Sequence, residues 1–158
     1  MKSPITAITA IIALVTLFLS LEVFACGDSL YRVGKGVSYR VYTAPLPGSV
    51  LVYGQSEAAK QLAEALAQSG HGVHFVENET DFAQEMGKGG YDVVIAAYSD
   101  HAVVEANQED SGTEFIPVAV SKEEEQAAKR TYDRVLLADQ AEIKHYLKAI
   151  HKSLKSKV

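Results

Sequence analysis

Cys26 is the only cysteine of this 158-residue chain, and its thiol is the strongest nucleophile that the sequence offers. A single cysteine cannot form an internal disulfide, so the fold must be held together by its apolar core. The thiol can instead carry a lipid, remain free or join two chains. The residues that stand before Cys26 bear on this choice.

Residues 1–25 have the order of an export signal peptide. Lys2 supplies the positive start, residues 5–21 are apolar apart from Thr and Ser, and the small Ala25 precedes Cys26. Cleavage after Ala25 would leave a soluble protein, whereas lipoprotein processing would acylate Cys26, although Phe24 is large for that route. A retained signal anchor is a third outcome, because about 17 apolar residues lie near the lower limit for a membrane span.

The chain is therefore expected to be periplasmic or secreted, and possible membrane contacts are a lipid on Cys26 or an uncleaved signal. Residues 26–48 would form an extended N-terminal segment, with an edge strand over 37–41. Removal of Lys2 and Glu22 with the signal leaves the net charge at −5. A mildly acidic domain without a basic stripe is not expected to bind nucleic acid.

Ser29 lies in the sequence Gly27-Asp28-Ser29-Leu30, which resembles the GDSL motif of a family of lipases and esterases. The resemblance implies a nucleophilic serine. No Gly-x-Asn or Asp-x-x-His follows, and a serine without a base is a poor nucleophile. A small hydrolase thus stays an alternative, and no catalytic residue is predicted. Gly34-Lys35-Gly36 lacks the spacing of a phosphate-binding loop.

The histidines do not form a metal-binding motif. His71 and His74 flank a predicted strand, His145 and His151 are six residues apart on a predicted helix, and His101 stands alone. None of these pairs has the helical spacing of two ligands. We expect solvated histidines, no metal site and no cofactor.

Strands and helices that would position a site alternate from Ser49 onward. Short apolar runs predict five strands, over 50–53, 73–76, 93–97, 115–120 and 135–137. Pro117 should lie near the start of the fourth strand or on an irregular stretch, since it has no N–H to donate. Helices are predicted over 56–69, 81–86, 101–108, from 121 onward, and after caps at Asp139 and Glu142.

This alternation predicts one α/β domain over residues 49–158, a three-layer sandwich around a parallel sheet. Its order and spacing resemble the receiver domain of bacterial response regulators. The features that carry the resemblance are the apolar first strand, Asp92 opening the third strand, Pro117-Val118 followed by the hydroxyl of Ser121, and the short fifth strand. The resemblance implies the flavodoxin-like strand order 2-1-3-4-5.

The chemical residues of that family do not carry over. Gly54 and Gln55 follow the first strand where receivers place acidic residues that hold Mg²⁺. Ala97 stands where the resemblance puts the phosphate-accepting aspartate, and Leu137 stands near the position of the family's lysine. Asp100 is an alternative, displaced acceptor. The resemblance therefore implies a receiver scaffold without phosphotransfer chemistry.

The carboxyl edge of the parallel sheet is where a ligand would bind. The residues expected to gather there, with helix N-termini suited to a polar or anionic group, are Gly54, Gln55, Ser56, Tyr98, Ser99, Asp100, Ser121 and Lys122. Several of them are also ordinary helix caps. The leading hypothesis is a non-catalytic receiver-like module that binds a protein partner in the cell envelope, and the alternative of another class is a periplasmic small-ligand or metal-binding protein.

Overall fold

The computed structural model describes residues 44–108 and 112–157. Residues 1–43 lie outside the described part of the chain, and with them the expected signal peptide, Cys26, the Gly27–Leu30 motif, Gly34–Gly36 and the edge strand expected over 37–41. Among the residues described, no helix is both long and apolar enough to cross a membrane.

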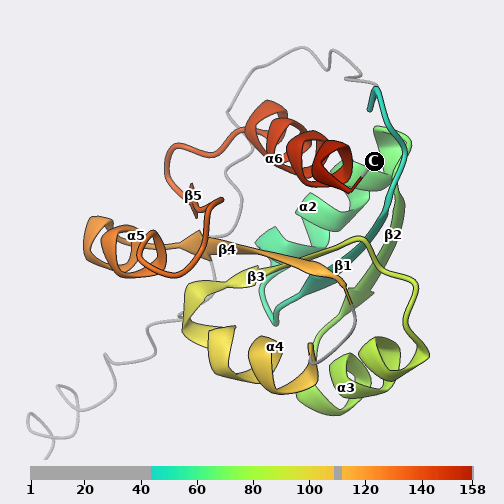
Figure 1. The fold of residues 1–158 in the computed structure, drawn as a ribbon, viewed down its shortest axis with the longest axis horizontal. Coiled ribbons are helices and arrows are strands. Elements are labelled where there is room, and N and C mark those ends of the chain that lie inside the picture. Colours follow the sequence, from blue (N-terminus) through green and yellow to red (C-terminus); the bar gives the residue numbers. More distant parts are fainter. Residues whose placement is uncertain (1–43, 109–111, 158) are drawn as a thin grey trace, which may run out of the picture.

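The predicted alternation of strands and helices is confirmed (Figure 1). The strands are β1 Ser49–Tyr53, β2 Gly72–Val76, β3 Val93–Ala97, β4 Glu114–Ala119 and β5 Leu136–Leu137. The helices are α2 Glu57–Gln68, α3 Glu79–Lys88, η1 Tyr98–Asp100, α4 His101–Asn107, α5 Lys122–Ala128 and α6 Ile143–Ser156.

All strand pairs are parallel, and the sheet has the order β2-β1-β3-β4-β5. The predicted receiver order is therefore confirmed. The central strands are buried on both faces: Val50, Leu51 and Val52 of β1 have no exposed surface. Such strands need helices on both sides, which explains their unbroken apolar sequence.

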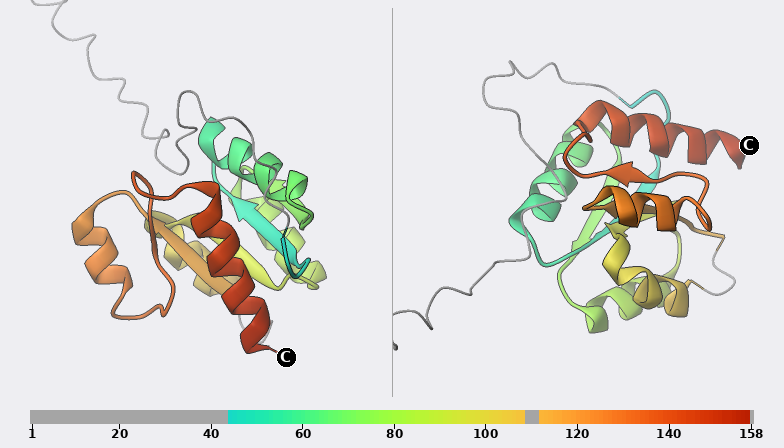
Figure 2. Two further views of the ribbon diagram at one scale, coloured as in Figure 1. Left: turned by 90° about the horizontal axis from the view of Figure 1, so that it is seen from above. Right: turned by 90° about the vertical axis from the view of Figure 1, so that its left-hand side faces the viewer.

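Two apolar cores lie on opposite faces of the sheet. Val50, Val52 and Ile95 face α2 and α6, while Leu51 and Val94 face α3 and α4. Figures 1 and 2 show these helix pairs on the two sides of the strands. The apolar face of α6 lies in the first core, where Leu147, Ile150 and Leu154 are buried and Ile143 is partly buried.

Helix caps differ from the predicted ones at two places. The side chain of Asn78 accepts the Asp81 N–H at 2.8 Å, so α3 starts two residues before the predicted cap at Asp81. Glu142, rather than Asp139, caps α6 in a reciprocal pair with His145. Both corrections have the same reason, because a capping side chain must reach the N–H groups of the first turn from an extended backbone.

Pro117 lies inside β4, opposite Ala96, and not near the strand's start. Ala119 turns its carbonyl toward β5, where it accepts the Ala138 N–H at 2.9 Å. Strand alternation puts the Pro117 nitrogen on that same side. Pairing with β5 begins only opposite Val118, so no ladder bond is lost at Pro117.

His71 corrects the expectation of solvated histidines. Its side chain is buried, with 6% exposed, and its Nδ1 accepts the backbone N–H of Gly48 at 3.2 Å. His71 lies in the turn between α2 and β2, and its imidazole contacts the segment that leads into β1.

Candidate functional site

The predicted edge residues follow three neighbouring strands of the sheet. Gly54, Gln55 and Ser56 follow β1, residues 98–100 follow β3, and Ser121 and Lys122 come shortly after β4. Because β1, β3 and β4 are parallel neighbours, these residues lie along the same edge. The Gly54 N–H donates to the Val76 carbonyl at 3.1 Å and so ties the ends of β1 and β2 together.

Two of the three serines of the edge, Ser56 and Ser121, act as helix caps. The Ser56 Oγ accepts the Ala59 N–H at 3.1 Å, and the Ser121 Oγ accepts the Glu124 N–H at 3.2 Å. The Glu124 carboxylate reaches back to the Val120 N–H at 2.9 Å. These contacts satisfy N–H groups that would otherwise be free for an anion.

Asp100 supplies the carboxylate among the predicted edge residues, and it is partly buried. Burial raises the pKa of Asp100 above its ordinary value, and a hydrogen bond from Ser99 opposes this rise. Tyr53 is buried beside it: burial first, and then the negative charges of Asp100 and Glu79, raise the pKa of its hydroxyl. The Tyr53 ring packs on Phe82 at a centroid distance of 4.7 Å. A carboxyl group and a phenol of this kind suit hydrogen bonding to a polar ligand.

Tyr98 is held in an aromatic group. Its ring stacks on His101 at 4.9 Å, and Tyr132 approaches both Tyr98 and Phe115 edge-on, at 6.4 and 5.1 Å. The Tyr132 hydroxyl donates to Glu105, which links this group to α4. Tyr98 therefore packs η1 and α4 against the residues that follow α5.

The positions at which receiver domains carry their phosphotransfer residues are occupied here by residues that cannot perform that chemistry. Gly54 and Gln55 follow β1, Ala97 ends β3 and Leu137 ends β5. Within residues 44–108 and 112–157, no three side chains of His, Cys, Asp or Glu lie close enough together to hold a metal ion.

A groove of about 370 Å³ lies elsewhere, between α5, β5 and α6. The right-hand view of Figure 2 shows β5 between these two helices. Val135 and Leu136 provide apolar surface, and the small Ala141, just before α6, and Ala149, within α6, also line the groove. Charged and polar side chains complete the lining: Glu125, Lys129, Asp133, Arg134, Gln140, His145, Lys148 and Lys152.

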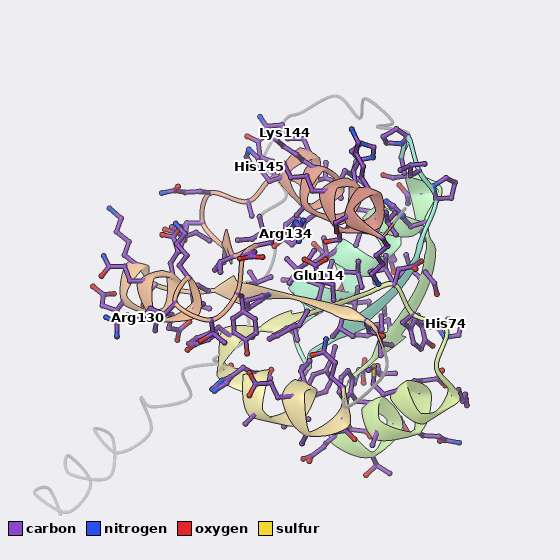
Figure 3. All side chains as sticks on the ribbon, in the orientation of Figure 1. His74, Glu114, Arg130, Arg134, Lys144 and His145 are labelled. Carbon is purple, nitrogen blue, oxygen red and sulfur yellow. The ribbon has the colours of Figure 1, made fainter. Side chains whose placement is uncertain are left out.

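The charges of the groove are unevenly paired. Lys129 binds Glu125 at 2.5 Å, and Arg134 binds Glu114 at the start of β4 (Figure 3). Lys148 and Lys152 are exposed, one turn apart on α6, and form no ion pair with the part of the chain that the structure describes. One wall of the groove thus carries two uncompensated positive charges.

Sequence reasoning missed this groove. The spacing of Lys148 and Lys152 on one side of the last helix was the available signal, but cations near a helix C-terminus are also favoured by the helix dipole, so the spacing does not indicate a groove. The opposite wall comes from Glu125 to Leu137, and only the strand order brings these segments together.

No family model and no curated protein matches the sequence. Among solved structures, the chain is similar to a response regulator receiver domain (CheY-like) from Methylobacillus flagellatus, with a TM-score of 0.55 and 21% identity. The match covers 70% of this chain and 98% of that chain. Together with the strand order, it shows that the described part of the chain has the fold of a receiver-like α/β domain.

Proposed function

We propose that this protein is an exported, non-catalytic receiver-like module that binds an acidic polypeptide segment in the cell envelope. The observation that carries the proposal is the groove between α5, β5 and α6, with Lys148 and Lys152 unpaired along one wall. The export signal in residues 1–25 supports the location.

The residues at the carboxyl edge support a role without phosphotransfer. An aspartyl-phosphate site needs an acceptor carboxylate together with a metal site that offsets phosphate charge. Gly54, Gln55 and Ala97 provide no carboxylate at the corresponding positions, and Ser56 and Ser121 cap helices. These residues therefore support a role in which the domain binds a partner through its surface and transfers no phosphate.

The groove has the mixed character of a peptide-binding surface. Its apolar part, around Leu136, can cover one or two aliphatic side chains of a partner. Lys148 and Lys152 lie about 5–6 Å apart at their Cβ atoms, as expected for positions one turn apart. Carboxylates of a bound segment could pair with both, and each exposed pair would contribute up to about 1 kcal/mol.

A labelled synthetic peptide rich in Glu and Leu tests this proposal by fluorescence anisotropy. We expect binding at low salt that weakens at high salt, because exposed ion pairs are screened. The double variant Lys148→Gln/Lys152→Gln should weaken binding about tenfold, the effect of losing about 1.4 kcal/mol.

The matched control is Lys60→Gln/Lys155→Gln, which removes the same charge from exposed positions outside the groove. It should bind the peptide like wild type. If both double variants weaken binding equally, the peptide responds only to net charge and the groove is not its site. If neither does, the proposal for the groove is wrong.

A small-ligand role at the carboxyl edge is the second candidate, and the raised pKa of Asp100 next to the buried Tyr53 favours it. Incubation with Mg²⁺ and a small acyl phosphate tests whether Asp100 is a displaced phosphate acceptor. We expect the intact mass to stay unchanged. An added phosphate that disappears in Asp100→Asn would show that a displaced acceptor works at this edge.

A further inference from the structure

The imidazole of His71 holds the segment that enters β1. Its Nδ1 accepts the Gly48 N–H at 3.2 Å, so in this contact the neutral ring carries its proton on Nε2. The ring is buried, and Nε2 is shielded from solvent without a hydrogen-bond partner among the residues described. A neutral imidazole is therefore the form that fits this site.

Three hydrogen bonds tie residues 44–48 to the corner between α2 and β2. The Ala44 N–H donates to the Ser69 carbonyl at 2.7 Å, the Gly72 N–H donates to the Gly48 carbonyl at 3.0 Å, and Gly48 donates to His71. Of these, only the bond to His71 passes through a side chain that titrates near neutral pH.

Protonation of the His71 ring would break this hydrogen bond. A second proton on the ring must go to Nδ1, where it would face the Gly48 N–H, so two donors would meet and the bond would be lost. The charge would also lie in a buried site, which is costly without a counter-ion. We propose that Gly48 and His71 form an acid-sensitive clasp, closed while His71 is neutral and opened when the ring binds a proton.

The pH range follows from the burial of the ring. Burial lowers the pKa of His71 below its ordinary value, which is about 6.5 in an unfolded chain. The closed clasp thus keeps its full stability above about pH 6.5 and loses it as pH falls toward the lowered pKa. Between the two pKa values, the opening equilibrium should rise by up to tenfold per pH unit.

Other titratable groups lie near the clasp and need controls. Asp92, ahead of β3, accepts the Ser49 N–H at 2.8 Å, and Lys157 at the end of α6 donates to the Asp92 carbonyl at 2.7 Å. His151 lies on α6, and His74 of β2 pairs with Glu85. The last turn of α2 carries no basic residue.

Nuclear magnetic resonance of the natively processed, ¹⁵N-labelled protein tests the clasp without a substitution. At pH 7 the His71 ring should carry its proton on Nε2. The protection factor of the Gly48 amide, corrected for intrinsic exchange, should fall by up to tenfold per pH unit below pH 6.5. The Gly54 amide, at the other end of β1, should keep its protection.

Two variants sharpen the test. His71→Asn keeps an acceptor near the place of Nδ1 but cannot ionise, so the pH dependence at Gly48 should disappear. His151→Gln and His74→Gln should each keep it. A proton on Nδ1 at pH 7, a Gly48 protection factor that stays constant from pH 7 to 5, or a wild-type slope in His71→Asn would overturn the proposal.

Discussion

A side chain at Gly48 would collide with Leu154 unless Leu154 moved. A Cβ at this position would lie 2.7 and 2.8 Å from the two Cδ atoms of Leu154 and 3.3 Å from the Asp92 carboxylate. The backbone there does not require glycine, since φ is not in the left-handed region. The constraint is therefore the close approach of α6 to the entry of β1.

We expect Gly48→Ala to lower the free energy of unfolding by about 1–3 kcal/mol, the usual cost of overpacking. Leu154→Ala should relieve the clash, so the cost of the double variant should be less than the sum of the two single costs. Urea unfolding measures all three. Gly87→Ala in α3 is the control: nothing lies near its Cβ, and it should raise stability by up to about 1 kcal/mol. Additive costs at Gly48 and Leu154 would contradict the contact.

Glu85 on α3 is a carboxylate that is strongly held in its ionised form. Hydrogen bonding to Lys88 first, and then to Tyr91, lowers the pKa of Glu85 to about 2. The Lys88 Nζ lies 2.5 Å from Oε1, and the Tyr91 hydroxyl donates to Oε2 at 2.7 Å. The stabilising effect of the ionised carboxylate is thus present above its ordinary pKa of about 4.5 and is lost as pH falls toward 2.

We therefore predict that Lys88→Gln raises the pKa of Glu85, and that Lys60→Gln, a charge-matched change on α2, leaves it near 2. Carboxyl ¹³C titration by nuclear magnetic resonance gives both values. An unchanged Glu85 midpoint in Lys88→Gln would mean that this ion pair is not formed in solution.

At the scale of the elements, the two serine caps determine how α2 and α5 start at the carboxyl edge. Ser56→Ala removes the acceptor of the Ala59 N–H and should cost about 1 kcal/mol in unfolding free energy. Ser56→Asp should restore most of this stability, because a carboxylate accepts the same N–H and suits the helix N-terminus. Urea unfolding distinguishes the two. If Asp destabilises as much as Ala, the hydroxyl of Ser56 does more than cap the helix.

The elements were predictable where one local pattern determines them. The five strands followed from runs of apolar residues, and the cap at Ser121 followed from a capping side chain three residues before Glu or Gln, here Glu124. Asn78 was missed as a cap because Asp81 fits the same rule three residues later. Pro117 was misplaced because its tolerance depends on where β5 begins, which is a property of the sheet and not of β4.

At the scale of the molecule, the strand order places residues from distant parts of the sequence beside one another. The carboxyl edge could be predicted, because parallel strands with known order must end together. The groove could not, since its walls come from α5 and α6, which are distant in sequence and meet only through the position of the edge strand β5. Burial of His71 was equally hidden, since it results from the return of residues 44–48 over the α2–β2 corner.

The last prediction concerns export, on which the proposed partner in the envelope depends. Residues 1–25 should be removed in a bacterial host, so the intact mass of the protein recovered from the envelope should correspond to a chain that begins at Cys26. An unmodified mass in the soluble periplasmic fraction would assign cleavage after Ala25. An added diacylglycerol mass in the membrane fraction, abolished in Cys26→Ser, would assign lipidation. Recovery of the unprocessed chain from the cytosol would contradict export, and the acidic partner would then have to be sought inside the cell.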